Sequence, residues 1–138
     1  MKVNSKKGFT LLEIIIVVII LGVLASLALP KLFGTVEFSR ASESLNVMGS
    51  LRDSLGRCIL STGASASCST SELDMADPDK TGGTHFTYSV TGLDTAGAMT
   101  ITATRNTIDG GTAGDKVILT VSSTGVTRFG SSKFVGVK

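Results

Sequence analysis

An apolar run near the N-terminus constrains this chain more than any other feature. Between Phe9 and Leu29 there are 21 residues, of which only Glu13 is ionisable. An α-helix rises about 1.5 Å per residue, so this run would span about 31 Å, the thickness of a bilayer hydrocarbon core. The 138 residues leave room for one modest folded domain beyond this segment. A fully soluble cytoplasmic protein is therefore excluded as a first interpretation.

Glu13 separates the possible interpretations of this segment. A secretory signal peptide could be cleaved at the small residues of Ser26–Ala28. A plain membrane anchor could be oriented by the basic Lys2, Lys6 and Lys7 on the cytoplasmic side. Neither accounts for Glu13, because signal-peptide cores are normally uncharged and a carboxylate at depth costs an anchor several kcal/mol.

A third interpretation accounts for the acidic residue. The sequence from Lys6 to Glu13 reads KKGFTLLE, and sixteen uncharged residues and Pro30 follow it. This combination resembles the N-terminus of a type IV pilin or type II secretion pseudopilin precursor, over about 30 of the 138 residues. The resemblance implies that a prepilin peptidase cuts between Gly8 and Phe9 and that the new amine of Phe9 is methylated.

The same resemblance gives Glu13 a role in assembly. Glu13 would be the fifth residue of the mature chain, and the family's glutamate at this position pairs with the terminal amine of a neighbouring subunit. The alternative is that Glu13 caps the N-terminus of its own helix, where the helix dipole favours a negative charge. Both can hold, the first in the filament and the second in the membrane.

A single helix is predicted over Phe9–Leu60. Gly22 and Pro30 would weaken and bend it, either as a tolerated transmembrane kink or, as the resemblance adds, as a stretch that unwinds during filament packing. Asp53 and Arg57 have the spacing of a helical ion pair. Beyond residue 30, apolar residues recur every three or four positions and predict one buried face. They are Leu45, Met48, Leu51, Leu55, Cys58 and Ile59.

The two cysteines lie at the end of this helix and in the loop after it. Cys58 and Cys68 are separated by nine residues, and Ser61–Ser71 is rich in Ser, Thr, Gly and Ala. In an exported domain this pair is a candidate disulfide, whereas in the cytosol it would be two free thiols. The exported location favours the disulfide.

The C-terminal half is rich in Thr and β-branched residues and predicts an antiparallel sheet. The predicted strands are Thr84–Val90, Ala98–Arg105 and Lys116–Ser122, with a fourth at Val126–Phe129 or Phe134–Val137. The fold class is thus α+β, a long helix packed on a small sheet, as the resemblance also implies. The regions are a leader (1–8), an apolar helix (9–30), an amphipathic helix (31–60), a connecting loop (61–83) and the sheet region (84–138).

No catalytic, cofactor or metal site is predicted. His85 is the single histidine, with no nucleophile placed beside it, so it is interpreted as a surface or edge residue. Three aspartates could offer oxygen ligands to calcium, although a solvated turn is favoured. These are Asp74, Asp77 and Asp79. Asp109 and Asp115 flank a glycine-rich hairpin turn. The net charge of +2 does not indicate a nucleic-acid surface.

The prediction is a structural subunit of a type IV pilus, serving adhesion, motility or DNA uptake. The implied partners are further copies of the chain in a helical filament, the prepilin peptidase and methyltransferase, and an inner-membrane assembly platform. The precursor would cross the inner membrane once, with its folded part on the periplasmic side, before joining an extracellular filament. The alternatives are a type II secretion pseudopilin in a periplasmic filament and, more remotely, a membrane-anchored binding module that does not assemble.

Overall fold

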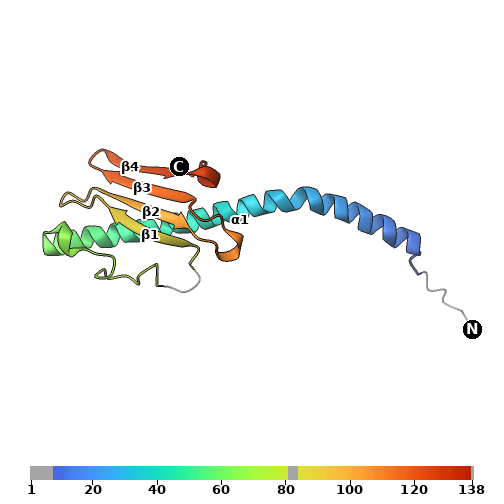
Figure 1. Cartoon of the computed structure of the whole chain (residues 1–138), viewed down its shortest axis with the longest axis horizontal. Coiled ribbons are helices and arrows are strands. Elements are labelled where there is room, and N and C mark those ends of the chain that lie inside the picture. The colour runs from blue at the N-terminus through green and yellow to red at the C-terminus, as the bar shows by residue number, and fades with distance from the viewer. Residues whose placement is uncertain (1–7, 81–83, 138) are drawn as a thin grey trace, which may run out of the picture. The chain divides into compact units, whose positions relative to one another are not determined.

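The computed structural model describes residues 8–80 and 84–137. Within them, one long helix, α1 (Leu11–Thr62), precedes four strands, β1 (Phe86–Thr91), β2 (Met99–Arg105), β3 (Lys116–Ser122) and β4 (Gly125–Gly130) (Figure 1). Short 3₁₀ helices occur at η1 (Ser65–Ser67), η2 (Ile108–Gly110) and η3 (Ser132–Phe134). The strands form one antiparallel sheet in the order β1-β2-β3-β4. The α+β fold expected from the sequence is confirmed.

The chain divides into two compact units, and the division falls between Thr35 and Val36, inside α1. We call the described residues 8–35 the stem and Val36–Lys138 the head. α1 continues without interruption through Gly22 and Pro30, and a bend at these residues stays a prediction. A proline removes one N–H donor from a helix of 52 residues, and the neighbouring hydrogen bonds maintain the helical path. Unwinding of this stretch in a filament stays a prediction.

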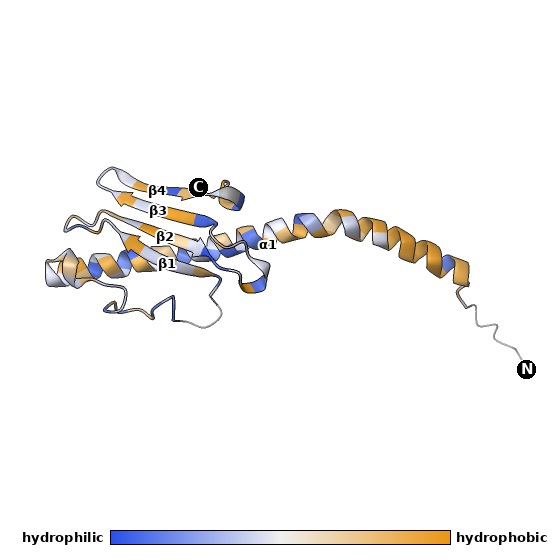
Figure 2. Ribbon diagram, viewed as in Figure 1, coloured by the Kyte–Doolittle hydropathy of each residue, from blue (hydrophilic) through white to orange (hydrophobic). Residues whose placement is uncertain are grey.

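The stem is apolar and exposed all round. An 18-residue stretch of α1 near the N-terminus has a mean hydropathy of 2.9, and none of it is buried. Its length and composition suit a membrane-spanning helix, although a signal sequence would have the same properties. Figure 2 shows the hydrophobic colour continuing along this part of α1 and giving way to a mixed pattern farther along.

The head buries one face of α1 against the sheet. Met48 and Leu51 are fully buried, and Leu55 and Ile59 are nearly so. They pack in one cluster with inward-facing residues of the sheet, namely Phe86, Met99, Ile101, Ala103, Val117 and Leu119. Leu45 and Cys58, the other members of the predicted face, are partly buried at its margin. The predicted amphipathic face is confirmed.

The sheet shows the alternation that one covered face requires. Burial alternates along β2, and Ile101 lies opposite Leu119 of β3 on the covered face. The fourth strand is β4, which contains the predicted Val126–Phe129. The alternative strand at Phe134–Val137 was wrong, because η3 instead turns Phe134 into the core, with its ring 5.8 Å from that of Phe86.

Candidate assembly site at the start of α1

The first turn of α1 is closed by two reciprocal hydrogen bonds between Thr10 and Glu13. The backbone N–H of Glu13 donates to Thr10 Oγ1 at 3.3 Å, and the backbone N–H of Thr10 donates to Glu13 Oε2 at 3.5 Å. Thr10 immediately precedes the first helical residue, so the pair forms a capping box, which satisfies two N–H groups that a helix start leaves free. In the single subunit, Glu13 therefore caps its own helix.

The predicted cleavage site lies directly before this cap. Phe9 has 80% of its surface exposed, and Gly8 is exposed as well. Lys2, Lys6 and Lys7 of the basic leader lie outside the described residues. The Glu13 carboxylate approaches the N–H of Thr10, one residue from the amine that cleavage would create at Phe9. The structure thus places the carboxylate close to the start of the expected mature chain.

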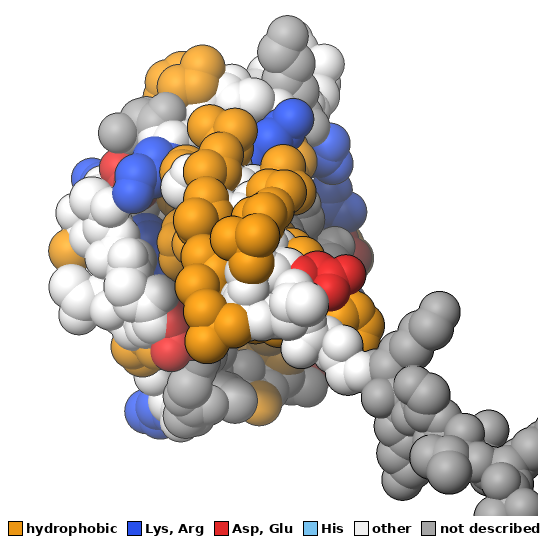
Figure 3. All heavy atoms as spheres, turned by 90° about the vertical axis from the view of Figure 1, so that its right-hand side faces the viewer, with side chains coloured by type: hydrophobic (Ala, Val, Ile, Leu, Met, Phe, Trp, Pro, Cys, Tyr) orange, Lys and Arg blue, Asp and Glu red, His pale blue; other side chains and the backbone are white. Residues whose placement is uncertain are grey.

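The surface of the stem is chemically uniform beyond this cap. Phe9, fourteen Leu, Ile and Val residues from Leu11 to Leu29, and then Leu32 and Phe33 are all exposed. Figure 3 looks toward the start of α1 and shows these apolar side chains gathered along it. Monomeric soluble proteins rarely leave contiguous apolar patches larger than a few hundred Å² exposed. Such a surface requires lipid or other protein as its surroundings.

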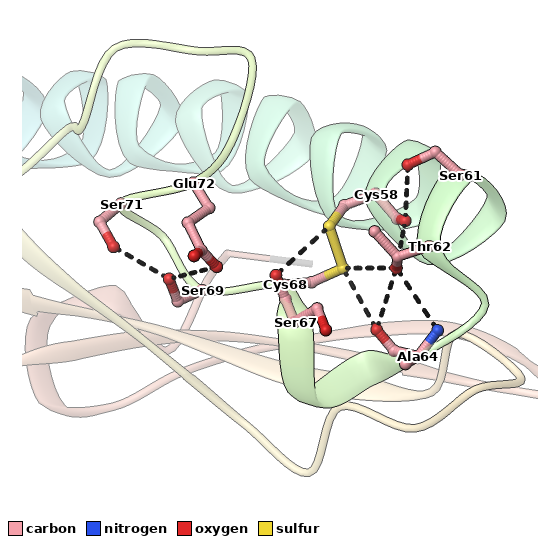
Figure 4. The surroundings of a disulfide bond; sticks show 9 residues. All are labelled: Cys58, Ser61, Thr62, Ala64, Ser67, Cys68, Ser69, Ser71 and Glu72. Carbon is pink, nitrogen blue, oxygen red and sulfur yellow. Dashed lines mark hydrogen bonds between the residues drawn. A yellow bond between two sulfur atoms is a disulfide. The ribbon is translucent and has the colours of Figure 1, made fainter.

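Cys58 and Cys68 form a disulfide that fastens the loop after α1 to the helix (Figure 4). Thr62, in the last turn of α1, donates from Oγ1 to the backbone oxygens of Cys58 at 2.8 Å and Ala64 at 3.1 Å. Cys68 follows η1 and is buried. The bridge and these bonds together hold η1 against the end of α1.

The aspartates considered as calcium ligands are engaged with other groups. Asp74 accepts two hydrogen bonds from the guanidinium of Arg57, at 3.0 and 2.9 Å. Asp79 Oδ1 accepts the backbone N–H of Tyr88 at 2.8 Å, which ties the loop to β1, and Asp77 pairs with Lys80. In the described parts of the chain, no three His, Cys, Asp or Glu residues are grouped as a metal site.

The helical ion pair predicted between Asp53 and Arg57 was wrong. Arg57 instead pairs with Asp74, which presents both carboxylate oxygens to its guanidinium, and Asp53 pairs with the adjacent Arg52. A bidentate pair has better geometry than a single i,i+4 contact. This pairing lowers the pKa of Asp74, chiefly through the hydrogen bond from Arg57.

Sequence reasoning missed a buried ion pair between α1 and β2. The side chain of Arg105 is fully buried, and its Nε and Nη2 donate to Glu37 Oε2 and Oε1, each at 3.0 Å. Its Nη1 donates to the backbone oxygens of His85 and Asn106. The hydrogen bond from Arg105 is the largest cause of a lowered pKa at Glu37. One signal was available: Arg105 continues the inward alternation of Met99, Ile101 and Ala103.

His85 and the predicted glycine-rich turn adjoin this pair. His85 Nε2 lies 2.9 Å from Asp109 Oδ2, and its hydrogen bond is the largest cause of the lowered pKa of Asp109. Arg40 pairs with Glu37 at 2.7 Å and with Asp109 at 3.5 Å. Asp109 lies in η2, between β2 and β3, and Asp115 is buried just before β3. These residues join the loops of the head to α1 and present no nucleophile beside His85.

Comparison with known proteins extends the resemblance from the first turns of α1 into the head. A family model described as the prokaryotic N-terminal methylation motif matches residues 3–29. Two type IV major fimbrial proteins FimA of Dichelobacter nodosus match. One is 34% identical over 91 residues, covering 64% of this chain and 58% of its own length. The other is 32% identical over 119 residues, covering 75% and 74%.

Type II secretion proteins match a shorter stretch. The type II secretion system core protein G of Pectobacterium carotovorum is 46% identical over 50 residues, which cover 36% of this chain and 32% of that protein. No solved structure matches the chain. Four observations point to the same family. They are the cleavage motif, the apolar stem, the helix-on-sheet head and the FimA similarity over three quarters of the chain. The chain belongs to the type IV pilin and pseudopilin family.

Proposed function

We propose that this protein is a structural subunit of a type IV pilus, without enzymatic activity, that is cut between Gly8 and Phe9 and polymerises through its stem. The observation that carries the proposal is the length of the FimA similarity. It covers 75% of this chain, whereas α1 accounts for 52 of the 138 residues, so the similarity includes much of the head. The similarity to protein G covers only 50 residues.

The capping box suggests how Glu13 serves before and during assembly. In the membrane, the Glu13 carboxylate accepts the N–H of Thr10, so the charge has a hydrogen-bond partner. The Thr10 hydroxyl in turn accepts the N–H of Glu13 at the start of the helix. Cleavage creates a protonated amine at Phe9 of each subunit. The amine of a neighbouring subunit offers Glu13 a charge-assisted hydrogen bond, which is stronger than the neutral N–H of Thr10. Glu13 would then exchange its own cap for the neighbour's amine.

The stem supplies the rest of the polymerisation surface. Its exposed apolar residues pack against lipid in the precursor and against the stems of neighbouring subunits in the filament. Gly22 and Pro30 are the positions at which we expect the helix to open there. The prepilin peptidase and methyltransferase, an inner-membrane platform and further copies of the chain are the proposed partners. The subunit would pass from the inner membrane to an extracellular filament.

The second candidate is a pseudopilin of a type II secretion system. The 46% identity with protein G over 50 residues favours it. The two candidates differ in the assembly that contains the protein, a type IV pilus or a type II secretion system. Expression in a strain that lacks its major pilin, and separately in one that lacks protein G, separates them. The proposal predicts that surface filaments return in the first strain and that secretion stays defective in the second. Recovered secretion without surface filaments would favour the pseudopilin.

The assembly mechanism is tested by Glu13→Ala, with Glu43→Ala as the matched control. Both are exposed glutamates of α1, but Glu43 lies in the head. Removing Glu13 makes membrane insertion easier and deletes the partner of the incoming amine. Glu13→Ala should accumulate as processed, membrane-held subunits with few or no sheared filaments, whereas Glu43→Ala should assemble. Wild-type filament numbers from Glu13→Ala would refute the pairing.

A further inference from the structure

A pocket opens in the head between α1, the connecting loop and β1. Its volume is about 270 Å³, less than the roughly 300–1,000 Å³ of most small-molecule sites. Val47 and Met75 line its apolar part, and Glu43 and Tyr88 add a carboxylate and a phenol. His85 also lines the pocket, but its Nε2 is engaged by a carboxylate of η2. The size and the lining suit one side chain that is apolar along its stem and charged at its end.

The potential inside this pocket is negative. Glu43 is exposed and forms no ion pair with any residue that the structure describes. Lys80, the only basic residue of the connecting loop, pairs with Asp77. Burial of Tyr88, followed by the charges of Glu43 and Asp79, raises the pKa of its phenol to about 12. The pocket therefore favours a positively charged group.

A cation of this kind lies on the opposite edge of the head. The two edge strands of the sheet are β1, which lines the pocket, and β4 (Figure 1). Arg128 of β4 is exposed, and within the described parts of the chain its side chain has no hydrogen bond or ion pair. It borders a groove beside Asn46 and Gly49 of α1. Arg52, in the same groove, already pairs with Asp53. Arg128 is thus the arginine of this groove that can pair with a carboxylate elsewhere.

The chemistry of the pocket matches that of an arginine side chain. An arginine packs its stem on apolar surface and pairs its guanidinium with a carboxylate or an aromatic ring. Val47 and Met75 would contact the stem, and Glu43 and Tyr88 would contact the guanidinium. The pocket and Arg128 lie on opposite edges of one head, so a contact between them must join two copies of the chain.

We propose that in the filament Arg128 of one subunit enters the pocket of a neighbouring subunit and pairs with Glu43 there. The inference rests on the proposed function, which supplies the neighbouring copies. A contact between two different surfaces leaves one copy with a free arginine and the other with a free pocket, so it repeats along a filament. The stems drive assembly, so this contact stabilises a filament that would also form without it.

Chemical cross-linking of sheared filaments tests the contact. The full-length chain carries Glu43→Cys and Arg128→Cys together and is treated with a short bis-maleimide, while the native Cys58 and Cys68 remain bridged. A short linker can join these positions only between subunits, because they lie on opposite edges of the head. The matched control combines Glu43→Cys with Lys116→Cys, because Lys116 is an exposed basic residue of β3. The proposal predicts a ladder of covalent oligomers from the first pair and none from the control.

Charge exchange provides an independent measurement. Arg128→Glu should lower the temperature at which filaments dissociate, because two carboxylates then meet at the contact. Adding Glu43→Arg to this variant should raise the dissociation temperature again. Lys116→Glu makes the same change of charge away from the contact, and it should leave the dissociation temperature unchanged.

The outcomes separate this contact from the proposed function. Filaments that give no ladder, or in which Arg128→Glu has no more effect than Lys116→Glu, would overturn the contact and leave the proposed function intact. Cross-linked dimers from Glu43→Cys alone would show that two pockets face each other, which would also overturn it. A parent chain that forms no filaments would overturn the proposed function and this contact together.

Discussion

Arg105 of β2 and Glu37 of α1 form a bidentate ion pair, with both N–O distances at 3.0 Å and the arginine side chain fully buried. The pair joins the far end of β2 to the first turns of α1 in the head. The guanidinium also lies 5.7 Å from the centre of the Phe86 ring. This one side chain therefore connects the helix, two strands and the loop after β2.

Loss of this arginine should destabilise the head strongly. Arg105→Ala removes both hydrogen bonds of the buried guanidinium to Glu37, which keeps only Arg40, and removes the donor to the Asn106 backbone oxygen. This loss should cost about 3–5 kcal/mol of the free energy of unfolding. Arg52→Ala is the control, because Arg52 pairs with Asp53 on the surface, and it should cost less than about 1 kcal/mol. Urea denaturation of a soluble chain that starts at Lys31 measures both. Equal losses of unfolding free energy in the two variants would show that the buried ion pair stabilises the head no more than a surface pair does.

The same ion pair should make the free energy of unfolding depend on pH in the acidic range. The pKa of Glu37 is lowered from 4.5, so the folded state holds the ionised carboxylate more strongly than the unfolded state does. Its contribution is present above the unfolded value and is lost as the pH falls through the lower folded value.

Glu37→Gln tests this dependence. The unfolding free energy of the parent should fall between about pH 5 and pH 3, whereas the variant should be less stable at neutral pH and show a shallower acid slope. Arg105→Ala should also make the slope shallower, because it removes the group that lowers the pKa. Identical acid slopes in the parent and Glu37→Gln would contradict the assignment. Denaturation measured across this pH range provides the data.

Burial of the α1 face predicts the effect of truncating its leucines. Leu51 is fully buried, so Leu51→Ala should cost about 2–5 kcal/mol, the usual range for such a cavity. Leu60, near the end of the same helix, is 87% exposed, and Leu60→Ala should change stability by less than about 0.5 kcal/mol. Denaturation of the soluble chain compares them. If Leu51→Ala unfolds like the parent, the face does not form the core.

Reduction of the disulfide should lower the stability of the head without unfolding it. Cys58 and Cys68 close a loop with a sequence separation of 10. A loop of this length contributes about 2–3 kcal/mol in the chain-entropy model. The core contacts of Leu51, Leu55 and Ile59 do not require the bridge. Thermal melts with and without reductant should differ, whereas those of a Cys58→Ser, Cys68→Ser double variant should coincide, which excludes other effects of the reductant.

Local patterns predicted most of this fold. The three-and-four spacing of Met48, Leu51 and Leu55 predicted the buried face of α1, and the content of Thr and β-branched residues predicted the strands. The partners of charged residues could not be predicted in this way. Arg57 pairs with Asp74 instead of Asp53, because the connecting loop places Asp74 beside the end of α1. The ion pair of Arg105 with Glu37 spans 68 positions, a distance that no local pattern encodes.

The central residue of the assembly site, Glu13, was predicted from the sequence. The sequence indicated Glu13 and its possible self-capping through the helix dipole. The pairing of Glu13 with Thr10 was not predicted, although the two residues have the capping-box spacing. The fourth strand remained ambiguous, since Val126–Phe129 and Phe134–Val137 are equally β-rich. In the structure, Phe134 lies at the end of the 3₁₀ helix η3 and its ring packs in the core beside Phe86.

The mass of the mature protein tests the central claim most directly. If the chain is a pilin-type subunit, intact-mass analysis and N-terminal sequencing of the native protein should find an N-methylated Phe9 as the first residue. Met1–Gly8 should be absent, because the basic leader holds the bond between Gly8 and Phe9 at the cytoplasmic face. A mature chain that retains Met1 would identify a plain anchor. A chain that begins at Leu29 would identify a secretory signal, and either result would contradict the account.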